Sequence, residues 1–274
     1  MAVPVDLRSR RPDSRVTTSA SHSGGASHQC GLPFFSGAGA RHAPGNVKEA
    51  KTENSGKSEM TGDAFGARGE LRPGVLGIAG SPRRGGNSDH LLDAILGGVR
   101  TVVGEVEAVR LRDYRFESCT GCERCRVDRA CTGLRDGMTL LYPSIVASRG
   151  LVLVTPVHNY NVSALAKAFI DRCYCFYDFE DPRPGPWSSR LAGQERKAVV
   201  AAVAEQPGEE GMGVTLEAMR LPLEALGYEV IDALAVPGMF DRGVVRRHPE
   251  VIDRVREAGR LLGTSLLPAT GDPR

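Results

Sequence analysis

The stretch VLGIAGSPRRGGNSDHLLDAILGGV, Val75–Val99, carries an apolar run, a glycine-rich turn and a helical pattern in direct succession. Val75–Gly80 is short, apolar and ended by Gly-Ser-Pro, which is typical of a buried strand. The apolar residues after the turn recur at helical spacing: Leu91, Leu92, Ile95, Leu96 and Val99. This strand–turn–helix order predicts the first unit of an α/β domain with a parallel sheet.

The same alternation continues along the chain. Further strands are expected at Val106–Leu111, Leu151–Pro156, Lys197–Ala204 and Tyr228–Val236. Further helices are expected around Tyr142–Ala147 and at Ser163–Phe176, Leu216–Leu226 and Pro249–Gly263. Five strands alternating with helices predict a three-layer, doubly wound, five-stranded parallel sheet covered on both faces. Because ligands bind such sheets at the carboxyl ends of the strands, the loops after Gly80, Pro156 and Ala204 are expected to share one site.

Residues 1–70 differ from the folded domain expected at 71–268. They are rich in Ser, Gly, Arg, His and Ala and lack a long apolar run, so we expect a disordered N-terminal extension. An organelle transit peptide is an alternative, although acidic residues argue against it: Asp6, Asp13, Glu49 and Glu53. A true start at Met60 would also explain the segment, and the isolated Cys30 receives no role.

The composition bounds the class of protein. The 274 residues are 41% hydrophobic and 25% charged, which is ordinary for a globular domain. The formal net charge of +2 is too small to indicate nucleic acid or an anionic membrane as a partner. No apolar run approaches the ~18 residues of a membrane-spanning helix, and the first residues lack the apolar core of a secretory signal. We therefore expect a cytoplasmic protein, in which clustered cysteines bind metal or act in redox chemistry.

The turn at Gly80–His90 has the features of an anion site. It joins a strand to a helix N-terminus, where free backbone N–H groups and the helix dipole favour negative charge. The residues that could bind the anion are Ser81, Arg83 or Arg84, Gly85, Gly86, Asn87 and Ser88. A Walker loop would need Lys after its second Gly, and the G-x-G-x-x-G fingerprint is missing. A monophosphate such as that of FMN suits the loop best, and a polar turn with an N-cap at Asn87 or Ser88 is the alternative.

Two segments resemble the signatures of the NADPH-dependent FMN reductase family, within the flavodoxin-like superfamily. GSPRRGGNS (Gly80–Ser88) resembles its S-P-R-x-x-G-N-[ST] loop, and TPVHNYNVSALAKAFIDR (Thr155–Arg172) resembles its second signature. The resemblance covers roughly residues 72–267 and implies a flavodoxin-like fold that binds FMN. It places the FMN phosphate at Ser81, Arg83, Gly86, Asn87 and Ser88. It places the isoalloxazine along Pro156, Val157, His158, Asn159 and Tyr160.

The second segment departs from the family pattern at two positions. His158 replaces the usual Tyr, which could change flavin contacts or redox tuning because imidazole is smaller and can be charged. A plain surface-loop residue is the alternative at this position. Ala166 replaces the usual Leu, which is a packing change. Lys167, Asp171 and Arg172 are expected to be structural or at a subunit interface.

Four cysteines fall within CTGCERCRVDRAC, Cys119–Cys131, at the spacing C-x2-C-x2-C-x5-C: Cys119, Cys122, Cys125 and Cys131. Four thiolates so close in sequence can hold a [4Fe–4S] cluster. Structural zinc and free thiols are the alternatives, although zinc sites usually pair two knuckles across a longer loop. The bacterial ferredoxin spacing does not fit. Cys173 and Cys175 lie on the expected helix after the second signature, and at least one is expected to be a small buried hydrophobe.

When the FMN reductase signatures and the four cysteines are taken together, the resemblance narrows to the iron–sulfur flavoproteins. This group combines the FMN loops with a C-x2-C-x2-C-x4-7-C motif. It implies electron transfer between a one-electron donor such as ferredoxin, a [4Fe–4S] cluster and FMN, with a small-molecule acceptor. It also implies a homodimer or tetramer that brings cluster and flavin of neighbouring subunits together. No catalytic side chain is expected, because the flavin carries the chemistry. The rival interpretations are an NAD(P)H-dependent FMN or quinone reductase without a cluster, and a non-enzymatic redox or metal sensor.

Overall fold

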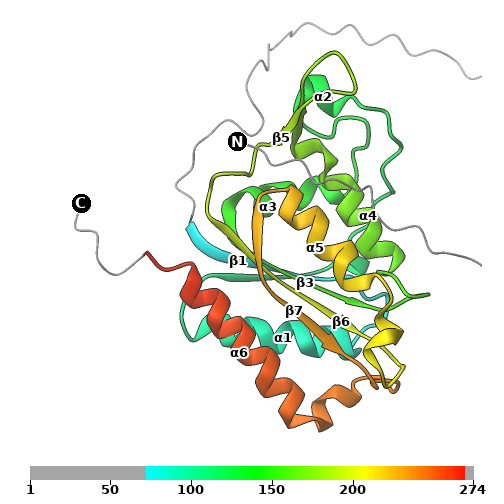
Figure 1. The fold of residues 1–274 in the computed structure, drawn as a ribbon, viewed down its shortest axis with the longest axis vertical. Helices are drawn as coiled ribbons and strands as arrows, with labels where there is room; N and C mark the ends of the chain where they lie inside the picture. Colours follow the sequence, from blue (N-terminus) through cyan, green and yellow to red (C-terminus); the bar gives the residue numbers. More distant parts are fainter. Residues whose placement is uncertain (1–71, 269–274) are drawn as a thin grey trace, which may run out of the picture. The chain divides into compact units, whose positions relative to one another are not determined.

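A computed structural model describes residues 72–268, and the expectations for residues 1–70 lie outside this range. Its main sheet has five parallel strands: β1 (Arg72–Ala79), β2 (Val106–Arg110), β3 (Ser148–Pro156), β6 (Arg196–Val203) and β7 (Tyr228–Val236). Their order is β2-β1-β3-β6-β7, so the direction of winding reverses between β1 and β3 (Figure 1). The predicted doubly wound parallel sheet is confirmed, and all five strands lie where the sequence placed them.

Helices cover both faces of the sheet (Figure 1). One face carries α1 (Asn87–Arg100) and α6 (Pro249–Ser265). The other carries α3 (Tyr142–Ala147), α4 (Ala164–Arg172) and α5 (Thr215–Ala225). Side chains of a strand alternate between faces, so Leu151 and Leu153 of β3 join one buried cluster while Val152 and Val154 join the other. The sheet is thus buried on both sides, which explains its nearly continuous apolar strands.

Helices α1 and α6 touch backbone to backbone through two glycines. A Cβ atom on Gly98 would lie 1.9 Å from the carbonyl oxygen of Arg256, and one on Gly259 would lie 1.9 Å from that of Ile95. Any larger residue at either position would force the helices apart. This close contact fixes α1, whose N-terminus borders the candidate site.

Three details differ from the sequence expectations. The cysteine segment, expected to be a loop, contains a four-residue helix, α2 (Cys125–Asp128). The helix expected at Ser163–Phe176 is shorter, because α4 ends at Arg172 and a 3-10 turn follows at Cys173–Phe176. An antiparallel hairpin of β4 (Tyr177–Phe179) and β5 (Trp187–Ser189) was not predicted at all. Among residues 72–268, no helix combines the length and the apolar character that crossing a membrane requires.

Candidate functional site

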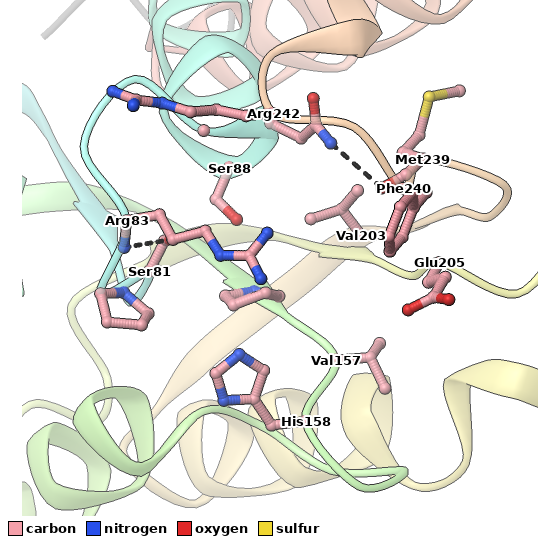
Figure 2. Close-up of a pocket in the computed structure, with 14 residues that line it drawn as sticks. Ser81, Arg83, Ser88, Val157, His158, Val203, Glu205, Met239, Phe240 and Arg242 are labelled. Carbon is pink, nitrogen blue, oxygen red and sulfur yellow. Dashed lines mark hydrogen bonds between the residues drawn. The ribbon is translucent and has the colours of Figure 1, made fainter.

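A cavity of about 210 Å³ opens at the carboxyl ends of the strands (Figure 2). It lies beside β1 and β3, the two strands between which the direction of winding reverses. The loops after β1, β3 and β6 all contribute to it, which confirms the expectation that they share one site. A further loop, after β7, was not expected there and contributes Met239, Phe240 and Arg242. The remaining lining residues are Ser81, Pro82, Arg83, Gly86, Asn87, Ser88, Pro156, Val157, His158, Val203 and Glu205.

The loop after β1 presents donors to this cavity. Helix α1 starts at Asn87 with Gly86 as its N-cap residue, so neither Asn87 nor Ser88 is the cap. The first backbone N–H groups of a helix have no intrahelical partner, and the helix dipole adds positive potential there. Ser81 and Ser88 are buried against the same end of the helix, at 4% and 1% exposure. The arrangement is suited to an anion such as a phosphate group.

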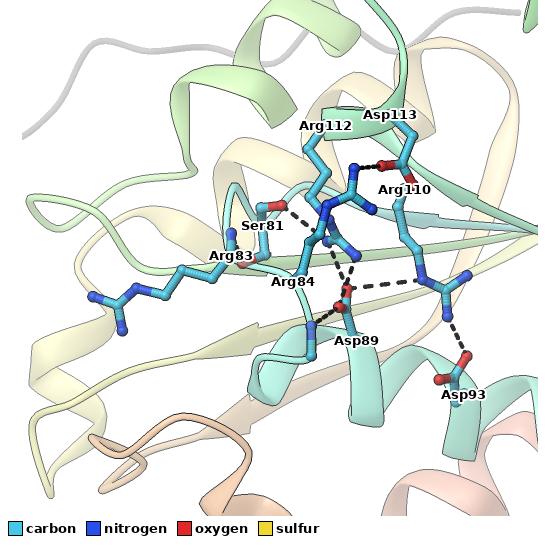
Figure 3. Close-up of polar contacts among 9 residues, drawn as sticks. Ser81, Arg83, Arg84, Asp89, Asp93, Arg110, Arg112 and Asp113 are labelled. Atoms are coloured by element: carbon cyan, nitrogen blue, oxygen red, sulfur yellow. Dashed lines mark hydrogen bonds and ion pairs between the residues drawn. The ribbon is translucent and has the colours of Figure 1, made fainter.

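The two neighbouring arginines of the loop have different surroundings. Arg83 is exposed, and its guanidinium extends over the cavity (Figure 2). Arg84 instead forms an ion pair with Asp113, with 2.6 Å between Nη2 and Oδ1 (Figure 3). The sequence left both arginines as candidates, and the structure brings Arg83 to the cavity.

A buried ion pair under the loop holds its shape (Figure 3). Asp89 accepts two hydrogen bonds of 2.8 Å from Arg112 and one of 2.7 Å from the backbone N–H of Gly85. Arg112 also donates to the carbonyl oxygen of Ser81 at 3.2 Å. Gly85 has a φ of +61°, which a residue without Cβ adopts readily. Sequence reasoning missed Arg112 because it belongs to no recognisable motif and lies beyond β2.

Asn87 anchors the loop that follows β7. Its Nδ2 donates to the carbonyl oxygens of Met239, at 3.1 Å, and Asp241, at 3.0 Å. Its Oδ1 accepts from the backbone N–H of Val245 at 3.1 Å. Both amide hydrogens are therefore used, so the side chain has no donor left for a phosphate. The backbone N–H of Asn87, at the start of α1, is then the group that remains for an anion.

The loop after β3 brings three of its five predicted residues to the cavity: Pro156, Val157 and His158. Asn159 and Tyr160 lie outside the cavity lining, in a tight turn with φ values of 49° and 62°. The turn is closed by paired backbone hydrogen bonds between His158 and Asn161, at 2.8 and 3.1 Å. The exposed imidazole of His158 faces the cavity from the side opposite Ser88 (Figure 2).

The four clustered cysteines line a second cavity, of about 380 Å³. It shares no lining residue with the first. Cys119 and Cys122 are exposed, whereas Cys125 and Cys131 are half-buried. Arg172, at the end of α4, also lines this cavity, together with Asp171 and Tyr174. The structure thus brings all four predicted cysteines together, in a place separate from the anion site.

The thiols differ in their surroundings. The backbone N–H of Arg124 lowers the pKa of Cys122 below its ordinary value. Burial raises the pKa of Cys125, and the charges of Cys131 and Cys119 raise it further. Cys173 and Cys175 are both buried, and burial raises the pKa of Cys175 to about 12. These last two cysteines are therefore neutral packing residues at physiological pH, which agrees with the sequence expectation.

The residues at the second cavity match a cluster in the type and number of their side chains. Within residues 72–268, no three His, Cys, Asp or Glu side chains converge closely enough to hold one metal ion. A zinc ion needs its thiolate ligands about 2.3 Å from one centre. In a [4Fe–4S] cluster the four thiolates surround a larger core. Four cysteine thiols line one cavity of about 380 Å³, which is the type and number of ligands that such a cluster uses.

The folded part of the chain is similar to proteins of a known family. The model of the NADPH-dependent FMN reductase family matches residues 73–240, more than half of the chain. Two relatives called iron–sulfur flavoproteins come from Archaeoglobus fulgidus, one 39% identical over 98 residues and one 32% identical over 129. The first match covers 36% of this chain and 44% of the relative, and the second covers 44% and 65%. The matched part of the chain therefore spans less than two thirds of the length of these relatives.

Solved structures show the same fold. An NAD(P)H:quinone oxidoreductase from Methanothermobacter marburgensis matches with a TM-score of 0.53 and 22% identity, over 68% of this chain and 97% of the other. A flavone reductase matches with a TM-score of 0.53 and 18% identity, over 70% and 62%. At these identities the likeness concerns the fold. The family match, which includes the loops after β1, β3 and β6 at the first cavity, shows that the chain belongs to the NADPH-dependent FMN reductase family.

Proposed function

We propose that the protein is an FMN-dependent oxidoreductase that passes electrons between a one-electron donor, a [4Fe–4S] cluster and FMN. One observation carries the proposal: a single α/β domain holds two separate cavities, one built for an anion and one ringed by four cysteines. Relatives called iron–sulfur flavoproteins support the pairing of the two centres. We further propose a homodimer or tetramer that works in the cytoplasm with ferredoxin or NAD(P)H as donor.

The first cavity would hold the FMN phosphate at the start of α1. Ser81 and Ser88 would donate hydroxyl hydrogen bonds, Gly86 and Asn87 would offer backbone N–H groups, and Arg83 would neutralise charge from the open side. The isoalloxazine would lie along Pro156–His158, with Asn159 and Tyr160 supporting that loop. Phe240, at 64% exposure on the rim, gives the ring an aromatic neighbour.

The second cavity would hold the cluster through Cys119, Cys122, Cys125 and Cys131. The half-buried Cys125 and Cys131 would anchor it toward the core, while the exposed Cys119 and Cys122 would close it toward solvent. When bound, the cluster would supply single electrons and FMN would take up two, with two protons from solvent. No side chain at the first cavity needs to act as an acid or base, so the chain's task is to bind, orient and shield the two groups.

A second candidate function is an NAD(P)H-dependent FMN or quinone reductase without a cluster. It is favoured by the exposure of two of the four cysteines and by the lack of a compact ligand group within the described part of the chain. In that case the first cavity would keep its role, and the thiols would be free.

Anaerobic purification followed by iron, sulfide and FMN assays separates the two functions. The proposal predicts about four iron and four sulfide per chain, together with one FMN and a visible absorption that bleaches on reduction. Protein that binds FMN and is reduced rapidly by NADPH, with no iron, would establish the second candidate instead.

A further inference from the structure

Arg172 is the most deeply buried charged residue at the second cavity, called the cysteine cavity below. Its side chain is fully shielded from solvent, yet it stands among the residues that line the cavity. From sequence, the residue was expected to be structural or at a subunit interface. A buried guanidinium is costly unless its donors are paired, so its partners indicate what it does.

The partners of Arg172 are the two ends of the cysteine segment. Its Nη1 donates to the carbonyl oxygen of Glu117 at 2.9 Å, two residues before Cys119. The same guanidinium binds the carboxylate of Asp136 in a bidentate manner, at 2.7 and 3.0 Å, five residues after Cys131. Asp136 in turn accepts from the backbone N–H of Glu117 at 3.0 Å. Arg172, Asp136 and Glu117 thus form a clasp that closes the 117–136 segment at its base.

One donor of Arg172 remains. Its Nε is buried and has no hydrogen-bond partner among residues 72–268. A buried donor without a partner is energetically unfavourable.

Another buried arginine shows what a purely structural role looks like. Arg196 donates from Nε to Gln194, from Nη1 to the carbonyl oxygens of Ile145 and Ser148, and from Nη2 to that of Val146. All of its nitrogens are paired, and it lines neither cavity. The buried Nε of Arg112 is also unpaired, but Arg112 lines neither cavity, so it is the location of Arg172 that sets it apart.

We propose that Arg172 is a positioning residue for the [4Fe–4S] cluster, closing the cysteine segment with Asp136 and placing its positive charge at the wall of the cavity that the four cysteines line. This inference rests on the proposed function. Closure of the segment limits how far the cysteines can separate, so it slows loss of the cluster. The cation stabilises the reduced cluster, which carries one more negative charge, and so raises the reduction potential.

The test compares three variants of the full-length protein, purified anaerobically. Arg172→Gln and Asp136→Asn each break the clasp, so both should lose iron to a chelator about 10-fold to 100-fold faster than wild type. Their cluster potentials should move in opposite directions, negative for Arg172→Gln, which removes a cation, and positive for Asp136→Asn, which removes an anion. The control is Arg183→Gln, because Arg183 is exposed and pairs with Glu123 of the same segment.

If the two substitutions only loosened the fold, they would not shift the cluster reduction potential in opposite directions. Unchanged potentials and iron-loss rates in both clasp variants, with the wild type loaded, would overturn this inference and leave the proposed function intact. Shifts of the same sign in both would also overturn it. A wild-type chain that binds no iron would overturn the proposed function and this inference together.

Discussion

The two cavities of this domain are built in different ways. The first cavity, called the anion cavity below, lies at the carboxyl ends of parallel strands. The buried Asp89–Arg112 pair and the side chain of Asn87 hold its loops in place. The cysteine cavity has no strand of the main sheet in its lining. Its segment contains only the four-residue α2 and is closed at its base by Arg172 and Asp136.

This difference predicts how each site responds to its ligand. The anion cavity is preorganised by the fold, so it should keep its shape when empty. We expect the cysteine cavity to change more when its ligand is removed, because metal binding is coupled to local folding and few elements of regular structure hold this segment. The following changes test this contrast.

The largest effect is expected from Asn87→Ala. The substitution removes three hydrogen bonds that tie α1 to the loop at 239–245 and leaves buried backbone groups without partners. We expect the free energy of unfolding to fall by about 3 kcal/mol, in urea titrations, with loss of FMN binding. Asn161→Ala is the control, because the exposed side chain of Asn161 accepts one hydrogen bond, from the backbone N–H of the neighbouring Val162. Equal stability of the two variants would show that the cavity does not depend on this anchor.

A smaller effect, confined to binding, is expected from Arg83→Ala. Arg83 forms no ion pair with the described residues and extends over the cavity, so its removal should leave stability unchanged. The affinity for FMN should fall about tenfold, since one charge-assisted hydrogen bond is lost at an exposed position. Fluorescence titration of FMN measures this. Arg84→Ala, which removes the partner of Asp113, should bind FMN like wild type, and an equal loss in both would contradict the assignment.

The smallest effect is expected in the reactivity of the cysteine thiols in metal-free protein. The lowered pKa of Cys122 and the raised pKa of Cys125 give Cys122 the larger thiolate fraction at any pH below both values. The labelling is done with iodoacetamide at pH 7.5, which is about one pH unit below the pKa of a free thiol. We expect Cys122 to be labelled several-fold faster than Cys125, as measured by peptide mass spectrometry. The buried Cys173 should stay unlabelled. Faster labelling of Cys125 would mean that this segment is open in the metal-free protein.

The sequence predicted most of the fold because strand and helix patterns are local. The run Tyr228–Val236, for example, coincides with β7. The β4–β5 hairpin was missed because its strands have three residues each and enclose a proline-rich loop. Cys173–Phe176 continues the apolar pattern of α4 but forms a 3-10 turn, which periodicity alone does not distinguish.

The site was predicted where a motif is local and missed where it depends on tertiary contacts. Ser81, Arg83 and the four cysteines lie in compact motifs and reach their cavities. Arg242 and Phe240 reach the anion cavity from a loop some 150 residues away, with no motif of their own. Asn87 was assigned to phosphate because of its place in the loop, and only the structure shows that its amide binds another segment.

The most direct test of the two-centre account is the substitution Cys122→Ser, with iron, sulfide and FMN measured in the same anaerobic sample. Cys122 lines the cysteine cavity and no part of the anion cavity. We predict that cluster absorption disappears while the FMN content stays at the wild-type value. Unchanged iron in the variant would contradict the account.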